Sequence, residues 1–427
     1  MLITNSYTWY NKGDAAIVLG MARAIREHLP SAEITVLSFT PKLDEAHYTQ
    51  WDIQTLTNVL NPYPMKGGKL STIVLTAPEL GARFVAGLVG RELPFRSAVR
   101  DTLEAYKHAD IVVGCGGAYL GGGKYQSLGH LYGLWLGKRF NKPVVLYAHS
   151  VVPFRSASLR LVTTYVLGRL DLVMCRERTT YDYLRSIGTR TPLAVVPDPA
   201  FLLTPIPSEH ASAMLRAFKI GLEDRPLIGM TVRNWGFPGI KQKDIKLREY
   251  KDSIAQLAKY VVNEQRGRVV LFPQVTYGPV DDDRMISNEI WASLPETVKT
   301  RVHVITAELE PSELKGMIGC MDFFVGTRMH SNIFALGQRV PCIGIAYEPK
   351  TRGIMETLGL AGQVVEIDNV GEGMLLDMYR RLFLSKEAMK EQINASVNVI
   401  EQEARTGGAF IAELLQTRNQ RQKRTGL

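Results

Sequence analysis

The stretch "VGTRMHSNIFALGQRVPCIGIAY" (residues 325–347) indicates the fold class of this chain. Its first residues complete an apolar run that is typical of a buried strand. Residues 331–336 follow as a helical pattern, and residues 341–346 form a second apolar run. A strand, a helix and another buried strand in this order predict parallel strands joined by a helical crossover. Arg328 and His330 come directly after the first strand, where a cation and an imidazole require an explanation.

The same alternation of apolar runs and helical patterns extends along the whole chain. We expect strands at residues 2–4, 33–39, 111–114, 144–148, 170–175, 193–196, 227–232, 269–272, 302–305, 323–325 and 342–346. A proline-rich segment at residues 197–210 is typical of a linker between two α/β units. The sequence therefore predicts two Rossmann-like domains, each with a doubly wound parallel sheet, and a cleft between them. The expected parts are an N-terminal domain, a C-terminal domain, and a helix with a basic tail, at residues 1–205, 206–385 and 386–427.

Composition favours a soluble globular protein of the reducing cytosol. The chain has 427 residues, of which 45% are hydrophobic and 22% are charged, as in ordinary globular proteins. Four scattered cysteines without a C-x-x-C spacing argue against a disulfide framework and a zinc site. The N-terminus has no export pattern. The most apolar segment, residues 70–89, contains Pro78, Glu79 and Arg83, which argues against a membrane span.

Nearly half of the net charge of +9 lies at the C-terminus. Four cations and no acid lie in the last ten residues, so the body of the chain is only mildly basic. A basic tail can attract an anionic membrane or nucleic acid, but a solvated, disordered terminus is the more frequent outcome. We expect no nucleic-acid partner. Together with residues 70–89, the tail leaves open a peripheral contact with the inner face of a membrane.

Arg328 and His330 have a functional explanation in this fold. In doubly wound sheets, ligands bind beyond the carboxyl ends of the strands. Helix N-termini point to the same edge and favour anions. The alternative is that the two side chains form hydrogen bonds between helices. As residues that project beyond strand ends contribute little to core packing, we expect the variants Arg328→Lys and His330→Ala to fold.

Polar or glycine-rich segments follow several other predicted strands. Asp14 precedes a helical pattern and suits either a helix N-cap or a site. The run "GCGGAYLGGG" (residues 114–123) has six glycines in ten residues, which suits backbone contact with a ligand or a tight strand-to-helix turn. His149 and Arg176 follow two further strands. The acid cluster at residues 281–283 is interpreted as the solvated start of a helix.

Several of these motifs together resemble the polysaccharide pyruvyl transferase family. The motifs are "NKGDAAI" (11–17), "GCGGAYL" (114–120), "AHSVVPF" (148–154), "CRERTT" (175–180), "PDPAFLL" (197–203), "DFFVGTRMHSNIFAL" (322–336) and "VPCIGIAYEPK" (340–350). The resemblance implies two Rossmann-like domains arranged as in GT-B glycosyltransferases. It also implies transfer of pyruvate from phosphoenolpyruvate to two sugar hydroxyls, giving a cyclic ketal in an exopolysaccharide or another cell-envelope glycan.

The chemistry of this reaction suits the residues at the strand ends. Phosphoenolpyruvate carries a carboxylate and a phosphate, which arginine forks bind bidentately. Arg176 and Arg328 are therefore expected to hold the donor from opposite domains. A histidine suits proton transfer, which we assign to His330, with Asp14 or His149 as the partner of the sugar hydroxyls.

The expected site thus consists of a catalytic set and a binding set. The catalytic set is His330, Arg328 and Asp14. The substrate-binding set, which rests largely on the resemblance, is Arg176, His149, Asn11, Gly116, Gly117, Ser331, Tyr347 and Lys350. No metal and no cofactor are expected, and phosphoenolpyruvate is the donor substrate. The acceptor is expected to be a sugar, an oligosaccharide or a lipid-linked glycan.

Two other classes of function compete with this hypothesis. A nucleotide-sugar glycosyltransferase of the same fold is favoured weakly by Glu348 and Glu356, which have the E-x7-E spacing of some retaining enzymes. Pro349, Lys350 and Thr351 stand where Gly-Phe-Gly usually follows the first glutamate. A glycan-binding scaffold would not need an arginine and a histidine at the ends of buried strands. Trp235 and other aromatic residues can stack on sugars, although packing in a core is their more frequent use.

Overall fold

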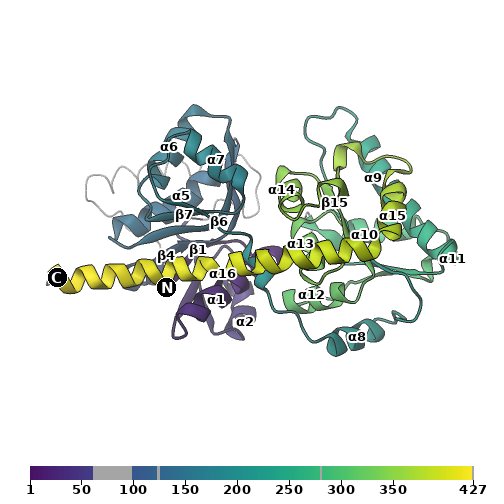
Figure 1. The fold of residues 1–427 in the computed structure, drawn as a ribbon, viewed down its shortest axis with the longest axis horizontal. Coiled ribbons are helices and arrows are strands. Elements are labelled where there is room, and N and C mark those ends of the chain that lie inside the picture. Colours follow the sequence, from purple (N-terminus) through teal and green to yellow (C-terminus); the bar gives the residue numbers. More distant parts are fainter. Residues whose placement is uncertain (61–98, 123–125, 279–280, 426–427) are drawn as a thin grey trace. The chain divides into compact units, whose positions relative to one another are not determined.

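The computed structural model describes residues 1–60, 99–122, 126–278 and 281–425. These residues form two compact units. The first unit consists of Met1–Trp9, Ile17–Leu202 and Glu403–Leu427, and the second unit of Tyr10–Ala16 and Leu203–Gln402. In Figure 1 each unit is a sheet with helices packed against it. Residues 70–89, considered above for membrane contact, lie outside the described residues.

The first unit contains a parallel sheet whose strand order reverses near its centre. Its strands run in the order β3-β2-β1-β4-β6-β7-β8, and β5 also pairs with β6. The bounds are β1 (Leu2–Ser6), β2 (Ile34–Ser38), β3 (Ile53–Thr57), β4 (Val112–Gly114), β5 (Gly117–Gly122), β6 (Val144–Phe154), β7 (Leu172–Cys175) and β8 (Leu193–Val195). The reversal falls between β1 and β4, which is the switch point of a doubly wound sheet. The predicted architecture of this unit is confirmed.

The helices of the first unit pack their apolar side chains on this sheet. They are α1 (Lys12–His28), α2 (Pro41–Thr49), α4 (Arg100–His108), α5 (Gln126–Arg139), α6 (Ala157–Leu167), α7 (Arg178–Ser186) and the short 3-10 helix η2 (Pro199–Leu202). One core cluster joins Val112 of β4, Leu134 of α5, Leu146 of β6 and Val173 of β7. The aliphatic residues of such a core contribute about 1.5–3 kcal/mol each when fully buried.

Two segments of the first unit differ from the sequence-based expectation. The run at residues 197–210 is not simply a linker, because η2 is fully buried within the unit. Helix α1 is not buried on one face alone, because residues 15–22 are all buried. The backbone carbonyl of Pro199 lies against Gly20, and Ala24 packs with Ala404. A second layer of chain therefore covers the face of α1 that would otherwise be solvated.

The glycine run after β4 is a strand and not only a turn. Strand β5 pairs in parallel with β6 after a short connection. Two of its glycines have positive backbone angles, with φ of 144° at Gly117 and 116° at Gly121. A Cβ atom at Gly121 would overlap the backbone of Val152 on β6. Glycine is therefore needed for β5 to lie this close to β6.

The second unit repeats the architecture with its own parallel sheet. The strand order is β13-β10-β9-β14-β15-β16. The bounds are β9 (Leu227–Thr231), β10 (Arg268–Leu271), β13 (Val302–Val304), β14 (Phe323–Gly326), β15 (Cys342–Ala346) and β16 (Val364–Glu366). A two-stranded antiparallel ribbon consists of β11 (Thr276–Tyr277) and β12 (Asp281–Asp282). The order reverses between β9 and β14, and the second doubly wound sheet is confirmed.

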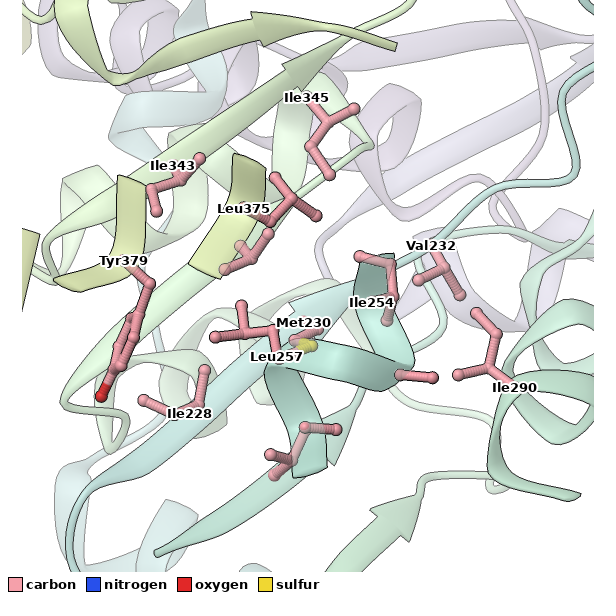
Figure 2. Packing of buried hydrophobic residues seen from close by; sticks show 14 of the residues in the cluster. Ile228, Met230, Val232, Ile254, Leu257, Ile290, Ile343, Ile345, Leu375 and Tyr379 are labelled. Carbon is pink, nitrogen blue, oxygen red and sulfur yellow. The ribbon is translucent and has the colours of Figure 1, made fainter. Parts of the chain in front are cut away.

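Helices of the second unit bury the alternate residues of these strands. They are α8 (Ser208–Ala217), α9 (Lys243–Asn263), α10 (Asp283–Ala292), α11 (Glu296–Lys299), α12 (Pro311–Gly319), α13 (Met329–Gly337), α14 (Pro349–Thr357) and α15 (Met374–Leu384), with the 3-10 helices η3 (Ala361–Gln363) and η4 (Ile367–Asn369). Figure 2 shows Ile228 and Met230 of β9 packing near Leu257 of α9. Residues two apart on a strand share one face of the sheet, which explains this pattern.

The C-terminal helix α16 (Lys386–Thr425) is longer than the sequence suggests. The basic tail was expected to be disordered, yet the chain is helical as far as Thr425. Arg418 donates a hydrogen bond of 2.8 Å to the backbone carbonyl of Asn141 within the first unit. None of the described helices is both long and apolar enough to cross a membrane.

Candidate active site

The second unit gathers polar side chains at one edge of its sheet. The central strands β10, β9, β14 and β15 are neighbours and run in parallel, so their carboxyl ends share one edge. The residues that follow these four strands include Gln274, Arg233, Arg328 and Tyr347. This edge is the place where a doubly wound sheet binds its ligand.

Arg328 is held by two carboxylates at this edge. Its Nη2 lies 2.6 Å from Oδ1 of Asp283, and its Nε lies 3.1 Å from the same oxygen. Nη2 also lies 2.6 Å from Oδ1 of Asp281. The Asp283 side chain is 1% exposed and that of Arg328 is 7% exposed, so this is a buried ion pair. The acid cluster does start a helix, but the expectation that it is solvated is wrong for Asp283.

The surroundings keep the Arg328 guanidinium charged. Burial alone disfavours its charged form, but Asp283, Tyr347 and Asp281 outweigh burial and raise the pKa of Arg328. Oδ2 of Asp283 also accepts hydrogen bonds of 3.0 Å from the backbone N–H groups of Gln274 and Val275. Nη1 of Arg328 makes none of the hydrogen bonds found among the described residues, which leaves this atom for a ligand.

Ser331 supports the backbone around Arg328. Its hydroxyl is buried, lies 2.6 Å from the hydroxyl of Thr231 and donates to the carbonyl of Arg328 at 2.6 Å. The backbone N–H of Arg328 donates to the Thr231 hydroxyl at 3.4 Å. Ser331 was expected to bind substrate. In the structure it fixes the turn between β14 and α13 and so positions Arg328.

The N-terminal segment Tyr10–Ala16 belongs to the second unit and brings Asn11 and Asp14 to His330. The imidazole of His330 occupies the space that a Cβ atom at Gly13 would take. The side-chain oxygen of Asn11 accepts from the backbone N–H of Gly13 at 3.2 Å. Asn11 also donates to Asp14 at 2.6 Å. The residue that caps the N-terminus of α1 is therefore Asn11. This corrects the interpretation of Asp14 as a possible N-cap.

Backbone pairing fixes this segment within the second unit. The N–H of Lys12 donates to the carbonyl of Gln274 at 3.0 Å, and that of Thr276 donates to the carbonyl of Tyr10 at 2.9 Å. The buried Lys12 ammonium forms an ion pair with Glu308. No local pattern in the sequence predicts this pair, because the two residues are far apart along the chain.

A cationic and aromatic cluster follows β9 and β15. The rings of Trp235 and Tyr347 lie 4.8 Å apart. The Arg233 guanidinium is 4.4 Å from the centre of the Tyr347 ring, and Lys350 is 5.7 Å from it. Lys350 also pairs with Glu348 at 2.8 Å.

The pKa of Tyr347 is lowered, because Lys350, Arg233 and Arg328 together outweigh the opposing effect of burial. Tyr347 and Lys350 are among the predicted site residues, and Arg233 is not.

Arg176 lies in the first unit and is already engaged there. Its Nη1 is 3.1 Å from Oδ2 of the fully buried Asp198, and its Nε donates to the Ser150 hydroxyl at 2.8 Å. Glu177 lies 3.5 Å from Nε and accepts from Ser150 at 2.6 Å. Nη2 of Arg176 is buried and has no hydrogen-bond partner among the described residues. As in Arg328, one terminal nitrogen is left for a ligand.

His149 is a buried, neutral histidine of the first unit. Its Nε2 accepts a hydrogen bond of 3.1 Å from the backbone N–H of Tyr119, which places its proton on Nδ1. Burial is the main cause that lowers its pKa well below the usual range, and Arg176 and His130 add to it. The Tyr119 ring stacks on His130 with centroids 4.5 Å apart. His149 therefore acts as a hydrogen-bonding group near pH 7 and not as a cation.

Gly116 and Gly117 make room for this aromatic group. The Tyr119 hydroxyl donates to the carbonyl of Gly116 at 2.6 Å. A Cβ atom at Gly117 would lie 2.5 Å from the Tyr119 ring. The two glycines were expected to bind substrate, and in the structure they also determine the backbone path around Tyr119.

The predicted site residues thus fall into two groups. The second unit brings together Asn11, Asp14, Arg328, His330, Ser331, Tyr347 and Lys350, and the first unit holds His149, Arg176, Gly116 and Gly117. Among the residues that the structure describes, no cluster of three or more His, Cys, Asp or Glu side chains could hold a metal ion.

Comparison with solved structures defines the fold class. The chain is similar to Anabaena Alr3699/HepE, solved in complex with UDP-glucose, with a TM-score of 0.60, 14% identity and coverage of 97% of this chain and 99% of that one. It is also similar to the UDP-GlcNAc 2-epimerase of Neisseria meningitidis bound to UDP-GlcNAc, with a TM-score of 0.58, 14% identity and the same coverage. The fold is therefore that of the GT-B class.

Sequence comparison identifies the family. The polysaccharide pyruvyl transferase profile matches residues 11–349, and the chain belongs to this family. It is also 24% identical to the amylovoran biosynthesis protein AmsJ of Erwinia amylovora, over 98% of this chain and 99% of that protein. The resemblance inferred from the motifs is confirmed, and family membership supports a role in pyruvyl transfer during polysaccharide synthesis.

Proposed function

We propose that this protein transfers pyruvate from phosphoenolpyruvate to two hydroxyls of a sugar in an exopolysaccharide or its precursor. The product is a cyclic pyruvate ketal, and inorganic phosphate is released. The observation that carries the proposal is the edge of the second sheet, where Arg328, His330 and the Asn11–Asp14 segment meet. This arrangement lies within the matched family segment and offers both a fixed guanidinium and an imidazole.

The reaction balances without an oxidant or a reductant. A proton adds to the methylene carbon of phosphoenolpyruvate and makes it a methyl group, which leaves positive charge on the neighbouring carbon. The first sugar hydroxyl adds to that carbon and loses its proton. The carbon–oxygen bond to phosphate then breaks, and the second hydroxyl closes the ring. Of the two hydroxyl protons, one balances the new methyl C–H bond and the other leaves with the phosphate.

Arg328 and His330 take different roles in this scheme. Nη1 of Arg328 binds an anionic group of the donor, while Asp283 and Asp281 fix the plane of the guanidinium. His330 carries the proton that reaches the methylene carbon, because an imidazole can act as a general acid and a general base. Asp14 lies in the adjoining turn of α1 and accepts a proton from a sugar hydroxyl.

The first unit contributes the other predicted groups. Nη2 of Arg176 offers a nitrogen for an anionic group, because it is buried without a partner among the described residues. His149 is held in its neutral form, so its role is in binding the acceptor and not in donating charge. We place the acceptor on this unit.

A nucleotide-sugar glycosyltransferase is the competing function. Two structural neighbours were solved with UDP-sugars, although their identity of 14% supports only the fold. The glutamates with the E-x7-E spacing give little support, because Glu348 pairs with Lys350 and Glu356 is exposed. A screen of phosphoenolpyruvate and UDP-sugars against candidate acceptors separates the two functions. Phosphate release without UDP release is expected, and UDP release would favour the glycosyltransferase.

A further inference from the structure

Arg233 differs from the other cations at the edge of the second sheet. It follows β9, and within the described ranges it forms no ion pair. Its Nε is buried and has no hydrogen-bond partner there. On the neighbouring strands, by contrast, Arg328 is paired with Asp283 and Lys350 with Glu348. The Asp281 carboxylate interacts with the charge of Arg233, but it forms its ion pair with Arg328. Partial burial of the Arg233 guanidinium is therefore still costly, and an anionic ligand would offset that cost.

Two aromatic rings hold this guanidinium in place. Its central carbon lies 4.4 Å from the centre of the Tyr347 ring and 5.2 Å from that of Trp235. An arginine that contacts aromatic faces in this way can still direct its N–H donors at a ligand. Lys350 adds a second cation 5.7 Å from the Tyr347 ring.

A neighbouring side chain also lacks partners. Gln274 follows β10, the strand on the other side of β9, and is 1% exposed. Both polar atoms of its side-chain amide are buried and without hydrogen bonds among the described residues. Buried side-chain amides normally form hydrogen bonds. The ends of the adjacent strands β9 and β10 therefore carry polar groups that a ligand could bind.

We propose that Arg233 and Lys350 form a phosphate subsite beside the Tyr347 ring, which takes the phosphoryl group of the donor. The identity of the donor rests on the proposed function, whereas the subsite rests on its own contacts. Arg233 supplies a charge without an ion pair among the described residues, and Lys350, although paired with Glu348, adds ammonium donors for a phosphate dianion. The carboxylate of phosphoenolpyruvate is then left to Nη1 of Arg328. When the carbon–oxygen bond breaks, the phosphate remains on Arg233 before it leaves.

Calorimetry with inorganic phosphate as the probe tests the subsite directly. Arg233→Gln should weaken phosphate binding roughly 10- to 100-fold, because hydrogen bonds to charged groups are lost. Pyruvate has a carboxylate but no phosphate, so its binding should not change. The matched control is Arg380→Gln, since Arg380 also lies over a tyrosine ring, 4.7 Å from that of Tyr260, and should leave both affinities unchanged. Equal phosphate affinity in Arg233→Gln and the wild type overturns the subsite.

A second measurement uses the wild-type protein and does not depend on the folding of a variant. Phosphate bound beside Tyr347 should oppose ionisation of the phenol and shift its alkaline titration to higher pH. A titration of Tyr347 that is the same with and without saturating phosphate overturns the subsite. Phosphate binding that needs Arg233, together with no pyruvyl transfer, would support the subsite and refute the proposed donor. Pyruvyl transfer together with a phosphate affinity that does not depend on Arg233 would support the proposed donor and refute the subsite.

Discussion

Arg328 and Asp283 are 45 residues apart in the chain and form a buried pair in which Nε and Nη2 of the guanidinium both contact the carboxylate. The pair joins the turn after β14 to the start of α10. It also leaves Nη1 as the guanidinium nitrogen that a ligand can use. The site arginine is therefore part of the interior of the second unit as well as a candidate binding group.

Removing the carboxylate of this pair should destabilise the protein. Asp283→Asn leaves the Arg328 cation buried without its main partner, and loss of one member of a buried pair costs about 3–5 kcal/mol. Arg328→Lys should also be destabilising, because an ammonium cannot reproduce the contacts of Nε and Nη2. This corrects the expectation that Arg328→Lys folds normally.

The free energy of unfolding in denaturant measures this effect, with Arg380→Gln as an exposed control that should match the wild type. An Asp283→Asn variant as stable as the wild type would show that the Arg328–Asp283 pair contributes little to the free energy of unfolding. Activity of Arg328→Lys should be measured at a temperature where the variant remains folded.

Gly13→Ala should disturb His330. The new methyl group would occupy the space of the imidazole, so the ring must move. We expect a destabilisation of about 1–3 kcal/mol from overpacking and a marked fall in the maximal rate, with smaller effects on donor binding. Gly353→Ala is the matched control, because Gly353 also lies in a helix of the second unit and a Cβ there meets nothing within 4 Å. If the Gly13→Ala enzyme kept the wild-type rate, the position of His330 would not matter for catalysis.

Tyr347 should ionise at lower pH than an ordinary tyrosine. Its pKa is lowered from 10.0 because Lys350, Arg233 and Arg328 outweigh burial. In the pH range between the folded-state pKa and 10, the unfolded state binds more protons, so this group stabilises the fold increasingly as pH rises. That contribution is lost as pH falls through the folded-state pKa. Ultraviolet titration should show an early tyrosinate signal that is absent in Tyr347→Phe, and an unchanged signal would contradict the assignment.

The first unit should lose stability in mild acid. Burial lowers the pKa of His130 to about 3, and burial with Arg176 and His130 lowers that of His149. Below the unfolded value of 6.5 the unfolded state binds more protons, so stability falls as pH falls, by about 1.4 kcal/mol per pH unit for each histidine. His130→Phe keeps an aromatic ring and should reduce the slope of unfolding free energy against pH between 6.5 and 5. A slope equal to that of the wild type would mean that His130 titrates normally.

Local patterns in the sequence were sufficient to predict the two doubly wound sheets and the position of Arg328 and His330. Both follow from strand periodicity and from the rule that polar residues at carboxyl strand ends face a ligand. The same rule also covers Arg233, which stands two residues after β9 but is not among the predicted site residues. That arginine was therefore within reach of sequence reasoning.

Other features depend on contacts between distant parts of the chain. The partner of Arg328 is not encoded in any local pattern, and an acid cluster at a helix start is usually solvated. The near-complete burial of α1 arises because η2 and part of α16 cover it. Likewise, the pairing of Lys12 with Glu308 becomes visible only once Tyr10–Ala16 is placed on the second unit.

In the proposed reaction, His330 delivers a proton to the methylene carbon of phosphoenolpyruvate while pyruvate is transferred to a sugar. The most direct test runs the reaction in deuterium oxide and analyses the ketal by mass spectrometry together with phosphate release. We predict one phosphate per ketal, deuterium in the new methyl group, and a fall in rate of about 10²–10⁴ in His330→Ala with donor binding largely kept. A ketal without deuterium in its methyl group, or wild-type turnover by His330→Ala, would contradict this prediction.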